Sequence, residues 1–236
     1  MRKNTTLWKK WNHKLGLGIH KLQWIIARRG AEVLKVGPLG MSEIWNAEDG
    51  AQPGGFMVYS TCSFNPVENE AVVAQLLRHF GDDLELVDTK DKLPGLERLP
   101  GLRTWKIQDD DGTWYTSFDQ VPQARKRKIL QSMFPPSSEE SDKFHLERSM
   151  RIAPYSQDSG GFFIALLKKS ERARAKGSRV VEVEADAEAD EAAKEAKAVL
   201  IEAGDEAETE QKHTVIPESE SGAYIPIKEQ LWNDIK

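Results

Sequence analysis

The chain has 236 residues, 39% of them hydrophobic, which is enough for one or two domains with a core. A single cysteine excludes an internal disulfide and favours a reducing compartment. No run approaches the roughly 20 apolar residues of a membrane span, and no secretory signal opens the sequence, so we expect a soluble intracellular protein that does not enter a membrane. The net charge of −5 divides into a basic body, residues 1–179 with 28 Lys and Arg against 22 Asp and Glu, and an acidic tail, residues 180–236 with 5 against 16. This plan is typical of polyanion binders, although an ordinary solvated surface is an equal alternative.

Two amphipathic helices are predicted first. One runs from Leu7 to Leu15, and the second covers residues 19–34. The second helix is expected to bury Ile19, Leu22, Ile26, Ala27 and Leu34. Four cations on these helices, Lys9, Lys10, Arg28 and Arg29, are candidate contacts to an RNA backbone, with solvated helix faces as the alternative.

Residues 37–53 are rich in glycine, proline and polar residues and predict an irregular loop. The next unit is a buried strand at residues 56–59, then a tight loop holding Cys62, then a helix that reaches Phe80. Asn65 and Glu68 have the spacing of a capping box at the start of that helix.

Cys62 has two interpretations. In parallel α/β sheets, ligands lie beyond the carboxyl ends of strands, and a nearby helix N-terminus lowers the pKa of a thiol, so Cys62 is a candidate nucleophile. The alternative is an inert thiol that packs as a small hydrophobic residue. Position alone does not decide between them.

Further along, residues 84–87 predict a strand, and residues 93–102 predict a loop. Residues 105–107 and 113–115 predict a hairpin whose acidic turn, 109–112, is expected to be solvated. Residues 135–142 predict a polar loop, and residues 162–167 predict a buried strand after Gly160-Gly161. His145 is expected to be structural, and no metal-ligand cluster is predicted. The densest basic run is a further candidate RNA contact and a weak localisation signal: Arg125, Lys126, Arg127 and Lys128.

The residues around Cys62, Tyr-Ser-Thr-Cys-Ser-Phe-Asn-Pro-Val-Glu-Asn-Glu, closely resemble the catalytic motif of the Sun-domain RNA cytosine-5 methyltransferases. The resemblance covers most of residues 1–170 and is greatest to the eukaryotic tRNA branch. It continues at four further segments: 93–96 (Leu-Pro-Gly-Leu), 133–136 (Met-Phe-Pro-Pro), 145–148 (His-Leu-Glu-Arg) and 160–163 (Gly-Gly-Phe-Phe).

The resemblance implies an α/β fold, the C-terminal part of a Rossmann-like S-adenosylmethionine-dependent methyltransferase sheet, with the Cys62 strand beside the 162–167 strand. It implies tRNA (cytosine-5) methyltransferase activity with Cys62 as the nucleophile. It further implies S-adenosyl-L-methionine as cofactor, RNA and specifically tRNA as partner, a monomer, and a nuclear or nucleolar location.

The resemblance also implies that the family's cofactor motifs, and a second cysteine that releases the product, precede Met1. We therefore expect a C-terminal fragment that is inactive alone and has no cofactor-binding residue of its own. A non-catalytic RNA-binding or partner-binding fragment and a nonfunctional truncated product are the alternatives. The expected divisions are the methyltransferase portion at 1–170, a disordered acidic linker at 171–214, and the start of a small RNA-binding domain at 215–236.

Overall fold

The computed structural model describes residues 14–34, 55–169, 194, 197 and 198. Lys9, Lys10, the first predicted helix up to residue 13, the predicted loop at 37–53 and almost all of the two predicted C-terminal segments lie outside these residues. No helix in the described part of the chain is long and apolar enough to span a bilayer.

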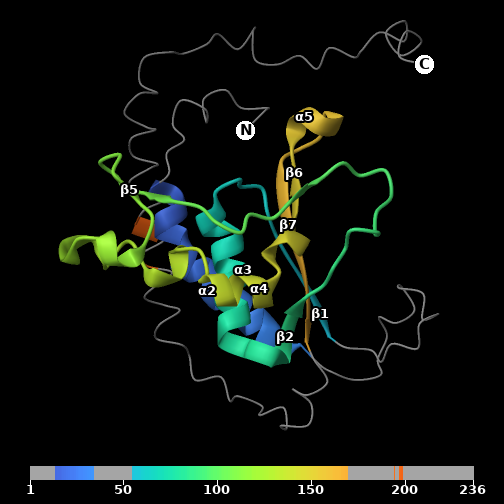
Figure 1. Cartoon of the computed structure of the whole chain (residues 1–236), viewed down its shortest axis with the longest axis horizontal. Coiled ribbons are helices and arrows are strands. Elements are labelled where there is room, and N and C mark those ends of the chain that lie inside the picture. Colours follow the sequence, from blue (N-terminus) through green and yellow to red (C-terminus); the bar gives the residue numbers. More distant parts are fainter. Residues whose placement is uncertain (1–13, 35–54, 170–193, 195–196, 199–236) are drawn as a thin grey trace, which may run out of the picture.

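The described part is a mixed α/β structure in which helices pack against one antiparallel sheet (Figure 1). The helices are α2 (Lys14–Val33), α3 (Glu70–Phe80), α4 (Ser138–Phe144) and α5 (Pro154–Gln157). The strands are β1 (Phe56–Thr61), β2 (Leu84–Leu86), β3 (Leu99–Pro100), β4 (Ile107–Gln108), β5 (Trp114–Tyr115), β6 (Met150–Ile152) and β7 (Phe162–Lys169). Six short 3-10 helices connect them, at Pro66–Glu68, Gly81–Asp83, Phe118–Gln120, Gln123–Arg125, Gln131–Met133 and Leu146–Arg148.

Strand β7 organises the main sheet. Along one edge it pairs with β1, from Phe56 opposite Lys168 to Thr61 opposite Phe163. Along the other edge it pairs with β6 near its start and with β2 near its end. The predicted adjacency of the Cys62 strand and the 162–167 strand is therefore confirmed. Every pairing among the described strands is antiparallel, so Cys62, after the end of β1, lies beside the start of β7.

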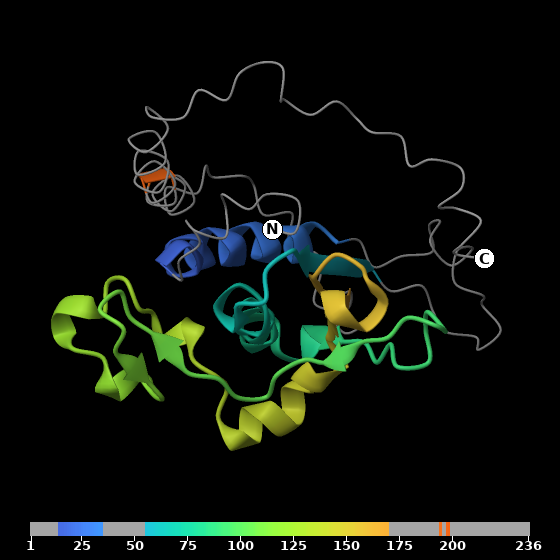
Figure 2. The same ribbon diagram turned by 90° about the horizontal axis from the view of Figure 1, so that it is seen from above.

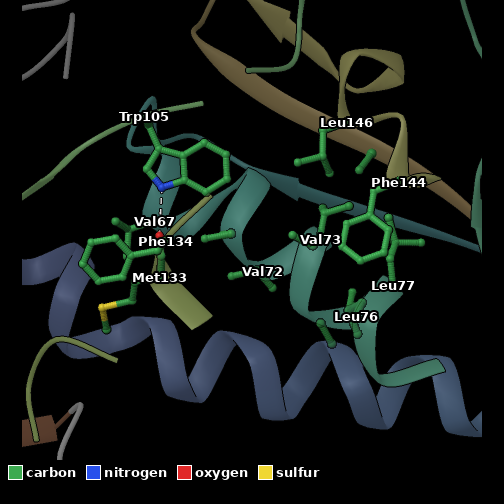
Figure 3. Close-up of a cluster of buried hydrophobic side chains, with 14 of the residues drawn as sticks. Val67, Val72, Val73, Leu76, Leu77, Trp105, Met133, Phe134, Phe144 and Leu146 are labelled. Carbon is green, nitrogen blue, oxygen red and sulfur yellow. Dashed lines mark hydrogen bonds between the residues drawn. The ribbon is translucent and has the colours of Figure 1, made fainter. Parts of the chain in front are cut away.

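Helix α3 lies at the centre of the packing, between α2 and α4 (Figure 2). Its apolar side chains recur at helical spacing, and Val72, Val73 and Leu76 are completely buried. Trp105, Met133 and Phe134 close one end of this core, where the indole Nε1–H of Trp105 donates to the Met133 carbonyl at 2.8 Å (Figure 3). The alternating residues Phe163, Ala165 and Leu167 bury the inner face of β7.

The predicted faces of α2 and β1 are partly wrong. Ile26, expected in the core, is 62% exposed, whereas its neighbour Ile25 is buried. Ala27 is buried as predicted, and the rest of the buried face of α2 includes Gly16, His20 and Ala31, through which α3 and the 66–68 turn approach closely. Strand β1, predicted to be buried, has no buried residue, since β7 is its single partner among the described strands.

Two predicted loops contain regular structure. Residues 135–142 were expected to be a polar loop, but α4 begins at Ser138. A capping box starts this helix: the Ser137 hydroxyl accepts from the Glu140 amide at 3.2 Å, and the Glu140 carboxylate accepts from the Ser137 amide at 3.1 Å. Within the loop predicted at 93–102, Leu99 and Pro100 form β3 against β6.

Candidate active site

Cys62 follows β1 directly, at a bend between the strand and the turn that leads into α3. Its side chain is exposed. Continuing the β1–β7 register by one residue beyond Thr61 and Phe163 sets position 62 opposite Phe162. The thiol is therefore open to a ligand at the junction of two strands.

Asn69 ties down the residues on both sides of Cys62. The Thr61 hydroxyl donates to Asn69 Oδ1 at 2.6 Å, and Asn69 Nδ2 donates to the Ser63 carbonyl at 2.9 Å. The Ser63 amide donates back to the Thr61 hydroxyl at 3.2 Å. Asn69 is completely buried between the 66–68 turn and α3. Because both neighbours of Cys62 share one buried amide, the loop holds the thiol in a fixed position.

Glu68 provides a second anchor. Its carboxylate accepts from the Ser63 hydroxyl at 2.7 Å, and its backbone carbonyl accepts from the Tyr59 hydroxyl at 2.6 Å. Burial raises the pKa of Glu68, and hydrogen bonds from Ser63, Gln23 and Asn65 lower it in part.

The capping box predicted for Asn65 and Glu68 is only half present. Asn65 Oδ1 accepts from the Val67 amide at 3.1 Å, as expected of an N-cap. Its own amide donates to the Ser63 hydroxyl at 3.1 Å rather than to Glu68. The chain also forms a 3-10 turn at Pro66–Glu68 before α3 begins at Glu70. Glu68 is thereby directed toward the Cys62 loop.

A buried ion pair lies behind the loop. Arg151 on β6 binds the Glu70 carboxylate with two nitrogens, Nε to Oε1 at 2.6 Å and Nη2 to Oε2. The third nitrogen, Nη1, donates to the Phe64 carbonyl at 3.0 Å. Glu70 also accepts from the Leu102 amide at 2.8 Å. Bidentate pairs of this kind fix direction as well as distance, so β6 positions the segment that follows Cys62.

The sequence did not identify Asn69, Glu70 or Arg151 as important. Arg151 offered one signal, because it stands between the buried residues Met150 and Ile152 in a strand. Charged side chains in such positions are rarely buried unless they are paired. Its partner could not be deduced, since 81 residues separate Arg151 from Glu70.

The predicted RNA contacts on α2 are engaged within the helix. Arg28 and Arg29 both pair with Glu32, at 3.5 and 2.9 Å, and the Arg28 guanidinium lies 5.8 Å from the Trp24 ring centroid. Side-chain exposures of 17% and 33% leave them partly accessible. Their contact with RNA stays a prediction.

The basic run at 125–128 and the acidic turn at 109–112 bind each other. Arg125 donates from Nε to Asp109 Oδ2 and from Nη2 to Asp110 Oδ2, both at 2.8 Å. The expectation of a solvated turn is wrong for Asp109, whose side chain is 2% exposed. The Arg125 guanidinium holds the pKa of Asp109 below its usual range. Arg125 is consequently committed to the hairpin formed by β4 and β5.

The other three cations of this run differ in their surroundings. Lys128 lies 3.8 Å from Asp110, and Lys126 lies 5.0 Å from the ring centroid of Phe118. Arg127 is exposed. The run therefore does not act as one uniform cationic patch. Arg127 and Lys128 are both exposed, and of the two, Lys128 is the one that lies near a carboxylate in the described part of the chain.

Other polar groups in the described residues do not form a second site of this kind. These residues contain no cluster of three His, Cys, Asp or Glu side chains that could hold a metal ion. His145 follows α4 in a left-handed conformation, and its Nδ1 lies 3.1 Å from Glu147 Oε1. A pocket beside Leu77, Gly81 and Phe144 lies at the end of α3 remote from Cys62, and there Lys143 pairs with Asp82 at 2.9 Å.

Comparisons with known proteins identify the origin of this arrangement. Residues 19–168 match the family model described as 16S rRNA methyltransferase RsmB/F. The chain is 43% identical over 171 residues to the multisite-specific tRNA:(cytosine-C(5))-methyltransferase of Saccharomyces cerevisiae, covering 72% of this chain and 22% of that protein. It is 39% identical over 184 residues to the tRNA (cytosine(34)-C(5))-methyltransferase of Drosophila melanogaster, covering 78% and 22%.

A solved structure also matches, a methyltransferase homolog protein from Pyrococcus horikoshii, with a TM-score of 0.36 and 26% identity over 64% of this chain and 31% of that one. The chain thus spans about a fifth of the length of the curated relatives, 22% in each case. The family model nevertheless covers most of the described structure, including β1, the Cys62 loop, α3 and most of β7. The chain belongs to the RsmB/F family of methyltransferases.

Proposed function

We propose that the protein methylates carbon 5 of cytosine in RNA, with S-adenosyl-L-methionine as methyl donor and Cys62 as the nucleophile. The observation that carries this proposal is the exposed Cys62 thiol between two anchored neighbours, Thr61 and Ser63. Two relatives whose names specify cytosine-C5 methylation of tRNA support the choice of base and of RNA.

The chemistry requires a nucleophile because carbon 5 of cytosine is unreactive by itself. A thiolate that adds to carbon 6 forms a sulfur–carbon bond and pushes electron density onto carbon 5, which can then take a methyl group. Loss of the carbon-5 proton to a base and breakage of the sulfur–carbon bond restore the aromatic ring and the thiolate. This is covalent catalysis, which divides one difficult step into easier ones.

The anchored loop suits this role for a geometric reason. Addition to carbon 6 requires the sulfur to approach the face of the base, and the base must first leave its stack. Asn69 and Glu68 hold the loop through Thr61 and Ser63 while leaving the thiol exposed. A nucleophile fixed in advance loses less conformational freedom when the base arrives.

Ligand sites in α/β folds commonly use a glycine-rich turn that receives the ligand. The glycine pair nearest to Cys62 in the β7 register, Gly160-Gly161, has no space for a ligand against its α-carbons, because the rings of Phe162 and Phe64 lie there. S-adenosyl-L-methionine would supply an electrophilic methyl group. We assign no residue of the described ranges to the methyl donor, and the absence of a cofactor-binding residue stays a prediction.

The substrate that we propose is tRNA, which is the RNA named for both relatives. The predicted monomeric state and nuclear location stay predictions. So do RNA contacts through Lys9, Lys10, Arg28, Arg29 and the basic run at 125–128.

Replacement of the nucleophile tests the proposal. In the natural full-length protein, Cys62→Ala should abolish methyl transfer to unmodified tRNA while leaving the thermal unfolding midpoint unchanged, since the side chain is exposed. Ser60→Ala is the matched control, because Ser60 is an exposed small residue on β1, two positions before Cys62. Undiminished methylation by Cys62→Ala would refute the assignment.

A further inference from the structure

Two phenylalanine rings lie exposed beside Cys62. Phe64 is two residues after the thiol, and Phe162 directly precedes Phe163, which pairs with Thr61. Each is 45% exposed, whereas the next residue of β7, Phe163, is completely buried. An isolated exposed apolar side chain is common and needs no explanation. Two exposed aromatic residues close to an exposed thiol, one along the chain and one on the neighbouring strand, form a more specific arrangement.

Both rings rest on the glycine pair at the start of β7. A Cβ atom added to Gly161 would lie 2.6 Å from Cε2 and Cζ of Phe64. A Cβ atom added to Gly160 would lie 2.8 Å from Cε2 of Phe162. Neither glycine has a positive φ, so the backbone conformation does not require them. Their role is to leave room for the rings.

The backbone of Phe64 is held independently of its ring. Arg151 Nη1 donates to the Phe64 carbonyl at 3.0 Å while the rest of the guanidinium is bound to buried Glu70. The ring of Phe64 therefore projects from a fixed point of the chain and lies against Gly161, with the Pro154 side chain also close to that glycine. An aromatic ring held in this way can stack without first being ordered by the ligand.

We propose that Phe64 and Phe162 form an aromatic platform that stacks on unpaired nucleobases next to the target cytosine. The proposal rests on the proposed function, since it takes its ligand class from the reaction assigned to Cys62. A base that is turned out to meet the thiol leaves its neighbours unstacked, and aromatic side chains are the usual replacement for a lost stacking partner. Stacking also tolerates any base, because each has a π-face.

The test measures the affinity of the 236-residue chain for a short, unstructured oligocytidylate over a range from about 50 to 200 mM salt. Phe64→Leu keeps a side chain of similar size but removes the ring, and it should weaken binding about fivefold or more. Phe64→Tyr restores an aromatic ring and should recover most of the affinity. The slope of log affinity against log salt should be the same for all three proteins, because stacking displaces no counterions.

Two further variants separate stacking from a general loss of structure. Gly161→Ala leaves Phe64 in the sequence but drives its ring from the glycine surface, and should weaken binding like Phe64→Leu. Trp114→Ala removes another exposed aromatic ring, 56% exposed on β5, and should leave the affinity unchanged. Absence of oligocytidylate binding, equal affinities for Phe64→Leu and the unaltered chain, or an equal loss in Trp114→Ala would overturn the platform. A slope of log affinity against log salt that differs between Phe64→Leu and the unaltered chain would also overturn the platform.

The platform and the nucleophile can fail separately. Loss of methylation in Cys62→Ala with unaltered RNA affinity in Phe64→Leu would retain the function and reject the platform. The reverse pair of results would retain the platform as an RNA-binding surface and reject Cys62 as the nucleophile.

Discussion

The Cys62 loop and the β4–β5 hairpin are two polar regions built in opposite ways. Around Cys62, the polar groups of Thr61, Ser63 and Asn69 bond to one another and leave the thiol exposed. In the hairpin, Arg125 bonds to Asp109 and Asp110, so the groups with the greatest charge satisfy each other. The first region therefore leaves its reactive group, the Cys62 thiol, exposed to solvent. In the second region the charged groups are bonded to one another.

The contrast between the two regions shows that a charged run or a lone cysteine cannot be interpreted without knowing its partners in the fold. An acidic turn and a basic run both suggest ligand binding when each is considered alone, yet they are each other's partners here. A lone cysteine suggests little by itself, yet the residues on both sides of Cys62 form hydrogen bonds with Asn69 and with each other that do not involve the thiol. The partners already used by a group's neighbours decide whether that group is available.

The largest expected effect concerns the ion pair behind the Cys62 loop. Arg151→Met leaves the Glu70 carboxylate buried without its cation and should lower the free energy of unfolding by about 3–5 kcal/mol. The double variant Arg151→Met, Glu70→Gln removes the stranded charge and retains an acceptor for the Leu102 amide, so it should regain part of that loss. Denaturant titrations of the two variants decide this. A loss below about 1 kcal/mol in Arg151→Met would place the pair among ordinary surface salt bridges.

The second effect is a pH dependence of the unfolding free energy that comes from His20, which contacts the turn after the Cys62 loop. His20 is completely buried, and its Nδ1 must carry the proton that meets the Val67 carbonyl at 2.6 Å. Burial lowers the pKa of His20 from 6.5 to about 4, so the folded state prefers the neutral ring. Its contribution to stability is present above pH 6.5 and is lost as pH falls toward about 4, by about 3 kcal/mol in all.

A control variant and the hairpin separate this effect from others. His20→Gln does not titrate, so the difference between its unfolding free energy and that of the unaltered chain should change between pH 6.5 and about 4. Asp109 has a pKa lowered from 3.8 by Arg125, and it loses its contribution only as pH falls below 3.8. If the unfolding free energies of His20→Gln and the unaltered chain differ by the same amount from pH 6.5 to about 4, the burial of a neutral His20 is contradicted.

The third effect concerns the loop itself. Asn69→Ala removes the amide that accepts from the Thr61 hydroxyl and donates to the Ser63 carbonyl, and it should cost about 1–3 kcal/mol of unfolding free energy. Methylation by the natural full-length protein should fall further than this loss of stability explains, since the thiol is no longer held. Asp111→Ala is the matched change in the hairpin turn. Because Asp111 is exposed and bonds locally to the Thr113 amide, its replacement should change stability little and leave methylation intact. Equal effects of the two variants would remove the contrast between the regions.

The smallest effect is a change in the salt dependence of RNA binding. Arg127→Ala should reduce the slope of log affinity against log salt by about one, as expected for one lost phosphate contact. The double variant Arg125→Met, Asp109→Asn removes one charge of each sign and should leave the slope unchanged, because these groups bind each other. A slope that changes in the double variant but not in Arg127→Ala would reverse our assignment of which cation is available.

Short apolar runs predicted β1 and β7, alternation predicted β2, and a turn between two short runs predicted the β4–β5 hairpin. Helical periodicity was sufficient to predict α3. It failed on α2, where Ile25 and Ile26 are adjacent and both apolar, so the helical period does not select which one is buried. Packing decided instead, through the small residues that let α3 approach. Helix α4 was missed because seven mostly polar residues have a weak period, although Ser137 and Glu140 carried a capping signal.

For the candidate site, the sequence identified Cys62 but not the residues that support it. Asn69 and Glu68 lie within a few positions of Cys62, yet their roles depend on a 3-10 turn that replaces the first turn of the predicted helix. Arg151 and Phe162 reach the loop only through the pairing of β7 with β1 and β6. Such contacts follow from the assembled sheet and are not encoded in any single segment.

The most direct test of the account traps the bond between Cys62 and its base. RNA in which 5-fluorocytidine replaces cytidine can accept the thiolate at carbon 6 and a methyl group at carbon 5, but fluorine cannot leave as a proton does, so the sulfur–carbon bond persists. Incubated with this RNA and S-adenosyl-L-methionine, the natural full-length protein should form a covalent complex that survives denaturation, and mass spectrometry should locate the RNA on the peptide containing Cys62. A complex on another residue, or an undiminished complex in Cys62→Ala, would contradict the assignment of Cys62 as the nucleophile.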